Sequence, residues 1–475
     1  MRRVTAVGER ELTGSNDPAS VVDLPMMIGG ASVESATGER YPVFNPANGL
    51  LVGTAPLGGP GDADQAVRSA TAAVSKWTAT PVHVRADAVA RGIDAVAEAS
   101  GSLAILLTRE QGKPLAEATT EILGFVERMR AFLRLAQSAS DGVVPILSSL
   151  RGAGRGSVSS PVRGVAVSLV AWNFPIGLLA KKIGPTLLGG GALIVKPAST
   201  TPLTTLRVVA LMNVGLPPGV LSCVTGRGDC VGAALIGDAA VARVYLTGSD
   251  ETGRRIQETA AGNGERLSLE LSGSDPMIVC ADADLGKAVQ AAVVGRFRNA
   301  GQACIAVKRL YVAEEVYDEF TSELCRLVRL REPGDGLVAA RAPRVRMGPL
   351  HTSAHREQIE EQLDDAVRKG AELLAGGGRP DHSEAHDGYF FNPTVAVNVL
   401  PETRLMTEEV FGPVLPVFKT RSLDDAIAQA NRSAWDLNAY IWTADKEHAR
   451  TVRHSITCRQ LWVNRLSFGS GYEAN

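Results

Sequence analysis

A cysteine, a glutamate and an asparagine are spaced along this 475-residue chain in a pattern that could support thiol chemistry on a carbonyl group. Cys304 follows the segment 298–303, Glu270 lies within the leucine-rich segment 267–273, and Asn173 precedes a Phe-Pro pair. A thiolate attacks carbonyl carbon, a carboxylate activates water, and an amide donor stabilises an oxyanion. Together these groups are the parts needed to oxidise an aldehyde through a thioester.

Each of these residues also has an ordinary structural explanation when it is taken alone. A single cysteine in a globular chain is most often a buried core residue. Glu270 alternates with leucines at 267, 269 and 271, a pattern that also predicts a solvent-facing strand residue. Asn173 also fits a turn before a proline. The predicted chemistry therefore depends on the combination and not on any one residue.

A second group of residues could bind the phosphates and sugars of a nucleotide. Lys196 ends the apolar segment 192–195, and a lysine between a strand and a helix is well placed to meet ribose or phosphate. Taken alone, such a lysine is more often the solvated lysine of a loop. Glycines and hydroxyls recur at 225–232 and 247–253, where two further helices are expected to begin. The glycine spacing at 226, 228 and 232 is not the dinucleotide fingerprint, so each cue is weak by itself.

Hydrophobic periodicity predicts an α/β fold, because short apolar segments alternate with helical ones after residue 163. Strands are expected at 165–170, 192–195, 220–224 and 244–246, and helices at 176–190, 202–214 and 229–237. The chain is too long for one core. We expect a flexible N-terminal arm (1–20), a cofactor-binding domain (21–140 and 161–270), a bridging or oligomerisation arm (141–160), a catalytic domain (271–455) and a shortened C-terminal segment (456–475). Because clefts between domains are common ligand sites, we expect the active site where the cofactor-binding and catalytic domains meet.

Composition excludes several classes of function. The net charge of −2 offers no general field for nucleic acid or an anionic membrane. No run of about 18 apolar residues exists, so no membrane span is expected. The six cysteines are scattered, which favours a reducing compartment, here the cytoplasm, and argues against a zinc site. The pairs His351/His355 and His382/His386 do not form a zinc motif, and no metal is expected.

Seven segments, in this order, resemble the aldehyde dehydrogenase superfamily over roughly residues 25–465. Glu270 and Cys304 are 304 − 270 = 34 residues apart, as in the family pattern. The segments are Trp172-Asn173-Phe174-Pro175, Lys196-Pro197-Ala198, Thr247-Gly248-Ser249, Leu269-Glu270-Leu271, Gly301-Gln302-Ala303-Cys304, Glu408-Glu409-Val410-Phe411-Gly412-Pro413 and Trp462-Val463-Asn464. The resemblance implies a Rossmann-like cofactor domain and an α/β catalytic domain.

The resemblance also implies a role for each residue. Cys304 would be the nucleophile, Glu270 the base for the deacylating water, and Asn173 with the backbone N–H of Cys304 the oxyanion hole. Hydride would pass to NADP or NAD, with Lys196 and Glu409 on the ribose hydroxyls. The residues that it implies for cofactor binding are Trp172, Lys196, Ser199, Gly228, Gly232, Thr247, Gly248, Ser249, Leu271, Glu409 and Phe411.

Two details of the resemblance concern specificity. Ser199 stands where many NAD-preferring relatives have a glutamate, and a serine hydroxyl can bond a 2′-phosphate that a carboxylate would repel, which favours NADP. Segments 108–115 and 297–302 are most similar to the NADP-dependent succinate-semialdehyde dehydrogenase branch. In that branch an arginine, here Arg298, binds the substrate's far carboxylate. A second arginine is replaced by Lys181, which keeps the charge and loses the bidentate fork.

The C-terminal segment departs from the family pattern. Relatives continue past Trp462-Val463-Asn464 into a loop that walls the substrate pocket and a strand that joins a neighbouring subunit. We therefore expect a reduced oligomerisation element and a homodimer. Two alternatives to aldehyde oxidation stay open: a relative that passes the acyl group to an amine or thiol, and a non-catalytic scaffold. Retention of Glu270 favours hydrolysis.

Overall fold

The computed structural model describes residues 20–138, 144–145, 157–158, 164–260, 266–337, 345–381 and 387–467. Nearly all of the expected N-terminal arm, the pair His382/His386 and the last eight residues lie outside this part of the chain. Of the expected bridging arm, it describes only the antiparallel pair β6 (Val144–Pro145) and β7 (Ser157–Val158). None of the described helices is long and apolar enough to cross a membrane.

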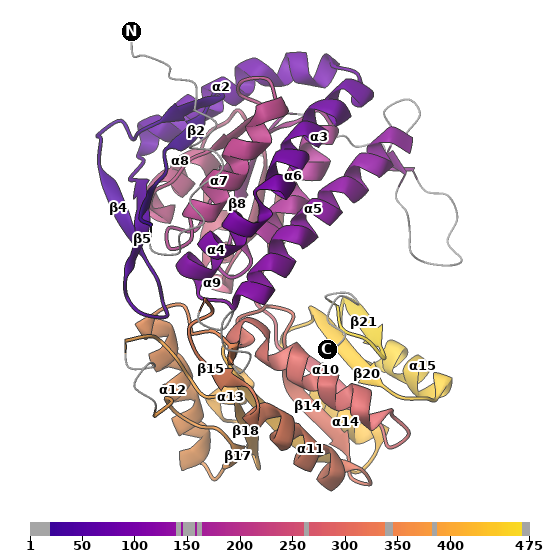
Figure 1. Ribbon diagram of the computed structural model, residues 1–475. Helices are drawn as coiled ribbons and strands as arrows, with labels where there is room; N and C mark the ends of the chain where they lie inside the picture. The colour runs from indigo at the N-terminus through magenta and orange to yellow at the C-terminus, as the bar shows by residue number, and fades with distance from the viewer. Residues whose placement is uncertain are drawn as a thin grey trace. The chain divides into compact units, whose positions relative to one another are not determined.

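The chain divides into two compact units, which are described separately (Figure 1). The first unit comprises residues 1–45, 50–111 and 118–271, and the second comprises residues 46–49, 112–117 and 272–475. The sequence-based division does not separate the two short early segments that belong to the second unit. The assignment of functions to domains stays a prediction.

The first unit is built on a seven-stranded sheet in the order β12-β11-β8-β9-β10-β2-β3. The five strands from β12 to β10 are parallel, and β2 and β3 continue the sheet in antiparallel fashion. A small separate sheet joins β1, β5 and β4. The strands are β1 (Val22–Asp23), β2 (Met26–Ile28), β3 (Ala31–Val33), β4 (Arg40–Phe44), β5 (Leu51–Pro56), β8 (Val165–Leu169), β9 (Ala192–Lys196), β10 (Leu221–Cys223), β11 (Val241–Thr247) and β12 (Arg266–Glu270).

Helices cover both faces of this sheet (Figure 1). On one face α2, α8 and α9 pack against alternate strand residues such as Val165, Val167 and Ile194. On the other, α6 and α7 contact β8, β9 and β10, with α3 and α4 packed on α7. The helices are α2 (Pro60–Ala79), α3 (Val82–Glu98), α4 (Ser100–Gln111), α5 (Leu115–Ser138), α6 (Pro175–Leu188), α7 (Leu203–Met212), α8 (Ala233–Ile236) and α9 (Asp250–Ala260).

The alternation predicted after residue 163 is confirmed, since β8, α6, β9, α7, β10 and β11 occupy the expected segments. The single helix expected over 229–237 is wrong in detail. It is divided into a π-helical turn, η3 (Gly228–Gly232), and the short helix α8. In this wider turn three successive N–H groups, those of Cys230, Val231 and Gly232, donate to the carbonyl of Arg227.

The second unit has its own seven-stranded sheet, in the order β17-β18-β19-β14-β13-β20-β21, parallel except for β17. Helices α10, α11 and α12 share an apolar core with one face, and α14 and α15 with the other (Figure 1). A short parallel pair joins β15 and β16. The strands are β13 (Asp275–Val279), β14 (Val307–Ala313), β15 (Glu332–Pro333), β16 (Val345–Met347), β17 (Glu372–Ala375), β18 (Thr394–Val397), β19 (Val414–Thr420), β20 (Asn438–Trp442) and β21 (Gln460–Val463). The helices are α10 (Leu285–Phe297), α11 (Tyr317–Arg329), α12 (Ser353–Arg368), α13 (Arg404–Thr407), α14 (Leu423–Ala430) and α15 (Lys446–Ser455).

Candidate active site

The carboxyl ends of the parallel strands in the first unit meet at one edge of the sheet. The chain starts at β8, moves outward to β9 and β10, and returns on the other side to β11 and β12. Ligands of such sheets bind at this edge, beside the strand where the order reverses. Asn173 follows β8, Lys196 ends β9, and Thr247 pairs in register with Glu270 at the ends of β11 and β12. The topology therefore gathers four predicted site residues along one edge.

Glu270 is held at this edge by two side chains. Nζ of Lys182 donates to Oε1 at 2.9 Å, and Oγ1 of Thr247 donates to Oε2 at 3.2 Å. Burial is the largest single influence and raises the pKa of the Glu270 carboxyl, but Lys182, Lys181 and Thr247 together outweigh it, and the pKa lies below its ordinary value. Glu270 is therefore ionised at neutral pH and able to accept a proton. Glu270 is a strand residue whose side chain stays 38% exposed, as the solvent-facing alternative expects, but it is also held by two hydrogen bonds, and its role as a base stays a prediction.

Lys182 was not among the predicted residues, whereas its neighbour Lys181 was. Both lie on α6, where consecutive residues point about 100° apart around the axis. Lys182 is buried against Glu270 and has its ammonium 5.4 Å from the ring centre of Tyr245, while Lys181 is exposed. A charged residue inside the apolar helix 175–188 was the signal that sequence reasoning could have used.

Asn173 is buried at the turn that leads into α6, and its neighbour Trp172 is partly buried. The start of this helix is fixed by Glu121, whose Oε1 accepts hydrogen bonds from the backbone N–H groups of Ile176 and Gly177, both at 2.9 Å. A carboxylate at a helix N-terminus is favourable because the first N–H groups have no partner within the helix. The turn that carries Asn173 is thereby anchored from α5.

Lys196 is only 6% exposed, so the solvated-loop explanation is wrong. Its Nζ donates to the carbonyl of Pro197 at 3.0 Å, and burial lowers the pKa of the ammonium to about 8. Nearby, Oγ of Ser199 donates to the carbonyl of Gly226 at 3.0 Å. Gly226 has φ +133°, and a Cβ there would lie 2.6 Å from the carbonyl oxygen of Gly58. The turn beside Ser199 thus requires glycine.

Two observations indicate that the carboxyl edge of the first unit's sheet could accommodate a nucleotide. A Cβ at Gly228 or Gly232 would meet nothing within 4 Å, so the space beside the start of η3 is open. Ser249 caps α9 by accepting from the N–H of Thr252 at 3.2 Å, and Gly248 donates to the carbonyl of Glu270 at 3.1 Å. Open space, hydroxyls and one buried cation suit sugars and phosphates. Leu271 packs against α9, 2.7 Å from where a Cβ of Gly253 would stand.

Cys304 lies in the second unit, on the connection between α10 and β14. Three successive residues before it, Asn299, Ala300 and Gly301, have left-handed φ values of 50°, 55° and 74°. Non-glycine residues in this region cost on the order of 1 kcal/mol or more each, so the surroundings must hold them. Glu117 does so by accepting the Asn299 N–H at 2.8 Å, and Nε2 of the buried Gln302 donates to the Asn299 carbonyl at 2.9 Å.

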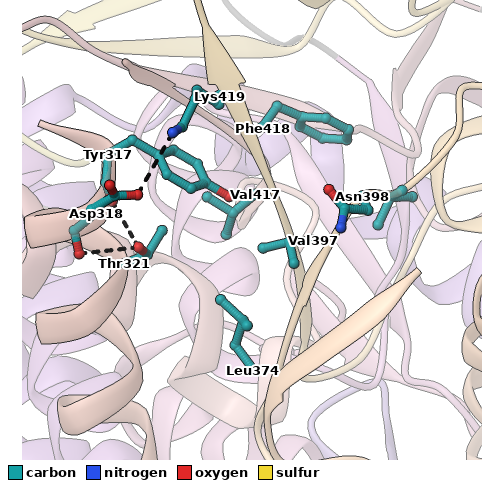
Figure 2. A pocket seen from close by; sticks show the side chains of 10 residues that line it. Tyr317, Asp318, Thr321, Leu374, Val397, Asn398, Val417, Phe418 and Lys419 are labelled. Atoms are coloured by element: carbon teal, nitrogen blue, oxygen red, sulfur yellow. Dashed lines mark hydrogen bonds and ion pairs between the residues drawn. The ribbon is translucent and has the colours of Figure 1, made fainter. Parts of the chain in front are cut away.

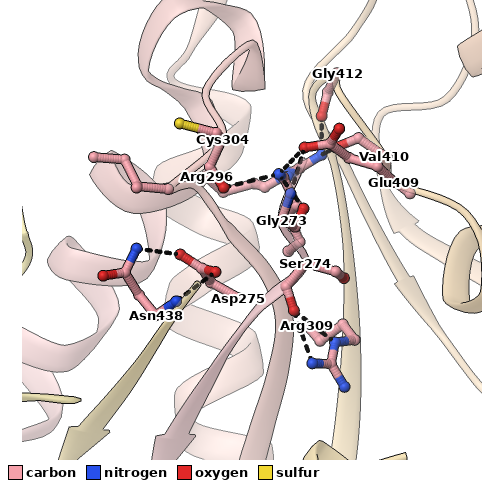
Figure 3. A network of polar contacts seen from close by, with 12 residues as sticks. Gly273, Ser274, Asp275, Arg296, Cys304, Arg309, Glu409, Val410, Gly412 and Asn438 are labelled. Atoms are coloured by element: carbon pink, nitrogen blue, oxygen red, sulfur yellow. Dashed lines mark hydrogen bonds and ion pairs between the residues drawn. The ribbon is translucent and has the colours of Figure 1, made fainter. Parts of the chain in front are cut away.

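The connection that carries Cys304 is also tied to the loop 408–412 (Figure 3). The buried Arg296 donates through Nη2 to the carbonyls of Val410, at 3.0 Å, and Gly412. A Cβ at Gly301 would lie 2.4 Å from the Gly412 oxygen, so the two backbones are in direct contact. The structure therefore brings Cys304 and Glu409 onto two loops that cannot move independently. Phe411 of the same loop lies 5.9 Å, between ring centres, from His355.

Arg298, predicted to meet the substrate, is partly buried near Glu117. Burial raises the pKa of the Glu117 carboxyl, and Arg298 is the foremost of the cations that oppose this effect. The Arg298 guanidinium thus interacts with the Glu117 carboxylate of the protein itself. Arg298, Cys304, Glu409 and Phe411 belong to the second unit, and the other predicted site residues belong to the first.

The second unit also has a hollow of about 660 Å³ (Figure 2). Its walls come from α11 and the carboxyl ends of β18 and β19, whereas Cys304 and Glu409 precede β14 and β19 at the opposite edge of the same sheet. Lys419 lines it, with its ammonium 4.7 Å from the ring centre of Tyr317 and 3.6 Å from Oδ1 of Asp318. The hollow is therefore separate from the candidate site.

One group of side chains in the described residues could hold a metal ion, namely Cys280, Asp282 and His448. The Asp282 carboxylate already accepts from Oγ1 of Thr443 and from two backbone N–H groups. These hydrogen bonds hold the loop before α15, and no metal motif is found in the sequence at these positions. Burial raises the pKa of the Cys280 thiol to about 12, which keeps it protonated.

Comparison with known proteins gives a consistent result. The model of the Aldehyde dehydrogenase family matches residues 32–473. The chain is 36% identical to the succinate-semialdehyde dehydrogenase [NADP(+)] of Escherichia coli over 92% of its length and 89% of the relative's. It is 34% identical to the glutarate-semialdehyde dehydrogenase of Pseudomonas putida, over 92% and 88%. A Staphylococcus aureus betaine aldehyde dehydrogenase solved with NAD+ superposes with a TM-score of 0.85 at 34% identity, over 93% of this chain and 87% of that one.

Proposed function

This chain belongs to the aldehyde dehydrogenase family, and from that premise we propose that it oxidises a small ω-carboxylate aldehyde to the acid through a thioester on Cys304. NAD(P)-dependent oxidation of an aldehyde is the activity of the family. The observation that carries the proposal is the state of Glu270, an ionised carboxylate held by Lys182 at the ligand-binding edge of the first sheet. A base in that state favours water as acyl acceptor over an amine or a thiol.

The proposed roles follow from the chemistry of each group. The Cys304 thiolate attacks the aldehyde carbon, and the amide of Asn173 with the Cys304 backbone N–H stabilises the alkoxide that forms. A nicotinamide ring, when bound, supplies the carbon that accepts a hydride. Loss of the hydride leaves a thioester on Cys304. Glu270 then takes a proton from water as the water attacks the thioester, and the acid leaves as the thiol is restored.

We propose that the substrate carries a carboxylate remote from its carbonyl. The names of both relatives cited above state semialdehydes of dicarboxylic acids as substrates. Arg298 offers a partly buried guanidinium, although Glu117 shares its charge, and Lys181 offers an exposed ammonium. A cation that meets this carboxylate would favour succinate or glutarate semialdehyde over a neutral aldehyde of the same length.

NADP is proposed as the preferred cofactor, with NAD accepted. Lys196 supplies a cation and Ser199 a hydroxyl where a 2′-phosphate would be met, and no carboxylate stands at position 199 to repel it. Two groups of residues are proposed to hold the cofactor, one from each unit. Those of the second unit are Glu409 and Phe411, and those of the first are Trp172, Lys196, Ser199, Gly228, Gly232, Thr247, Gly248, Ser249 and Leu271. We further propose a homodimer, which light scattering would separate from the 49.9 kDa protomer.

The test is absorbance at 340 nm with succinate semialdehyde, glutarate semialdehyde and neutral aldehydes of matched length, each with NADP+ and NAD+. Cys304→Ala is expected to abolish reduction, while Cys458→Ala, at a cysteine of similar partial exposure in the same unit, leaves it unchanged. Product analysis would detect the free acid. Activity that survives in Cys304→Ala, or an acyl product other than the acid, would sink the proposal.

A further inference from the structure

A buried lysine beside the nucleophile has no role in the chemistry described so far. Lys308 is the second residue of β14 and is 1% exposed. Its ammonium donates to the carbonyl of Gly273, to the carbonyl of Cys304 at 3.0 Å and to Oε1 of Glu409 at 2.5 Å. A buried ammonium is costly unless each of its three N–H groups finds an acceptor. The three acceptors here match the three donors.

The three acceptors come from three loops that meet at one edge of the second sheet. Gly273 precedes β13, Cys304 precedes β14, and Glu409 lies in the loop before β19. These strands are neighbours and parallel, so their amino ends lie together. Lys308 is therefore the side chain that joins the nucleophile's backbone to Glu409.

Glu409 is fixed by these contacts. Its Oε1 accepts both from Lys308 and from the backbone N–H of Gly273 at 3.2 Å, and the carboxylate is 19% exposed. The rotation of the carboxylate is thereby restricted before any ligand binds, and its charge is neutralised. The ammonium also lies 5.6 Å from the ring centre of Phe411, the other residue of this loop that we assign to the cofactor.

We propose that Lys308 is a positioning residue for the cofactor, which acts by holding Glu409 with Oε2 available to the ribose diol of a nicotinamide nucleotide. The inference rests on the proposed function, since it assumes that Glu409 meets this ribose. Fixing the carboxylate in advance removes an ordering cost from binding. Neutralising it removes the repulsion that a bare carboxylate would exert on an anionic cofactor.

Substitution of Lys308 by Met provides the test, with direct titration of NADP+ and NAD+ by protein fluorescence. The dissociation constants of both cofactors are expected to rise at least about tenfold, equivalent to about 1.4 kcal/mol. The aldehyde KM should change much less than the cofactor KM. Lys308→Gln, which keeps a donor and loses the charge, should show the same direction and serves if the Met variant does not fold.

Arg309→Met is the matched control. Arg309 is the next residue of the same strand, is 2% exposed, and donates to the carbonyls of Ser274 and Ala430 without contacting Glu409. The Arg309→Met substitution removes an equally buried cation, so it should lower thermal stability with little effect on cofactor affinity. An affinity loss in Arg309→Met as large as in Lys308→Met would overturn the positioning role.

A double-mutant cycle with Glu409→Gln decides whether Lys308 acts through Glu409. In the Glu409→Gln background, Lys308→Met should have almost no further effect on cofactor affinity. Additive losses, or unchanged affinity in Lys308→Met, would refute the inference. The proposed function would fail differently, because the unsubstituted protein would then lack Cys304-dependent NADP+ reduction.

Discussion

The ammonium nitrogen of Lys182, on α6, lies 2.9 Å from Oε1 of Glu270, at the end of β12. The lysine is nearly buried, and the carboxylate side chain is 38% exposed. The pair keeps the proposed base charged without sealing it from solvent. It also sets the strength of that base, because a lower pKa means a weaker proton acceptor.

Lys182→Met is expected to raise the pKa of Glu270. The substitution removes the interaction that most strongly lowers this pKa, whereas burial, which raises the pKa, remains. Below its pKa the base is protonated and inactive, so the acidic limb of thioester hydrolysis should move to higher pH. Single-turnover hydrolysis of an ester substrate between pH 4 and 8 measures that limb. Lys181→Met, which removes the exposed neighbouring charge, should move it less, and identical limbs in all three proteins would contradict the assignment.

Cofactor affinity should weaken above pH 8. Burial lowers the pKa of Lys196 to about 8, so the free protein loses this cation as the pH rises through that value. The dissociation constant of NADP+, measured by titration from pH 7 to 9.5, is expected to increase over this range. Lys196→Met should bind weakly and with a flatter profile. Lys76→Met, at an exposed lysine on α2, serves as control, and a flat profile in the unsubstituted protein would count against Lys196 as a cofactor ligand.

Glu110 should make the first unit more stable in mild acid. The buried carboxylate accepts from the N–H groups of Leu203 and Thr204, each at 2.8 Å, and burial raises its pKa from 4.5 to about 7. The folded state thus binds a proton more tightly than the unfolded state. The free energy of unfolding should fall between about pH 4.5 and 7, by up to about 3 kcal/mol, and level off above.

Glu110→Gln removes this titration. Urea unfolding midpoints at pH 5, 6, 7 and 8 should depend less on pH in the variant than in the unsubstituted protein. Asp275, whose pKa burial also raises to about 7, contributes the same trend to both proteins and cancels in the comparison. Glu98→Gln, at an exposed glutamate, is the control. Equal slopes for Glu110→Gln and the unsubstituted protein would refute the prediction.

Gly301→Ala should both destabilise the second unit and slow the reaction of Cys304. The left-handed φ of +74° alone costs an alanine about 1 kcal/mol, and the new Cβ would lie 2.4 Å from the Gly412 oxygen. Alkylation by iodoacetamide, with thermal unfolding measured alongside, tests both effects. Gly378→Ala is matched for φ, at +65°, and meets nothing within 4 Å, so it should show the backbone cost alone. Equal effects in the two variants would mean that the contact with Gly412 is unimportant.

The sheet of the first unit could be predicted well because buried parallel strands are continuous apolar segments. Segments 165–170 and 192–195 are of this kind, and glycine or proline bounds them. The named motifs of the site could likewise be placed at strand ends. The partners of Lys182 and Lys308 could not be predicted, because they are 88 and 101 positions away in sequence and no local pattern records such a contact. For the same reason, the sequence does not predict that residues 46–49 and 112–117 belong to the second unit.

The position of β20 in the second sheet has a consequence for synthesis on the ribosome. β20 pairs with β13 and separates it from β21, although about 160 residues of chain lie between β13 and β20. Glu117, which holds the backbone beside Cys304, is made before the cysteine, whereas β20 is made well after it. The nascent chain therefore carries the thiol while the next 438 − 304 = 134 positions are made, before the strand that completes the surroundings of Cys304 is available.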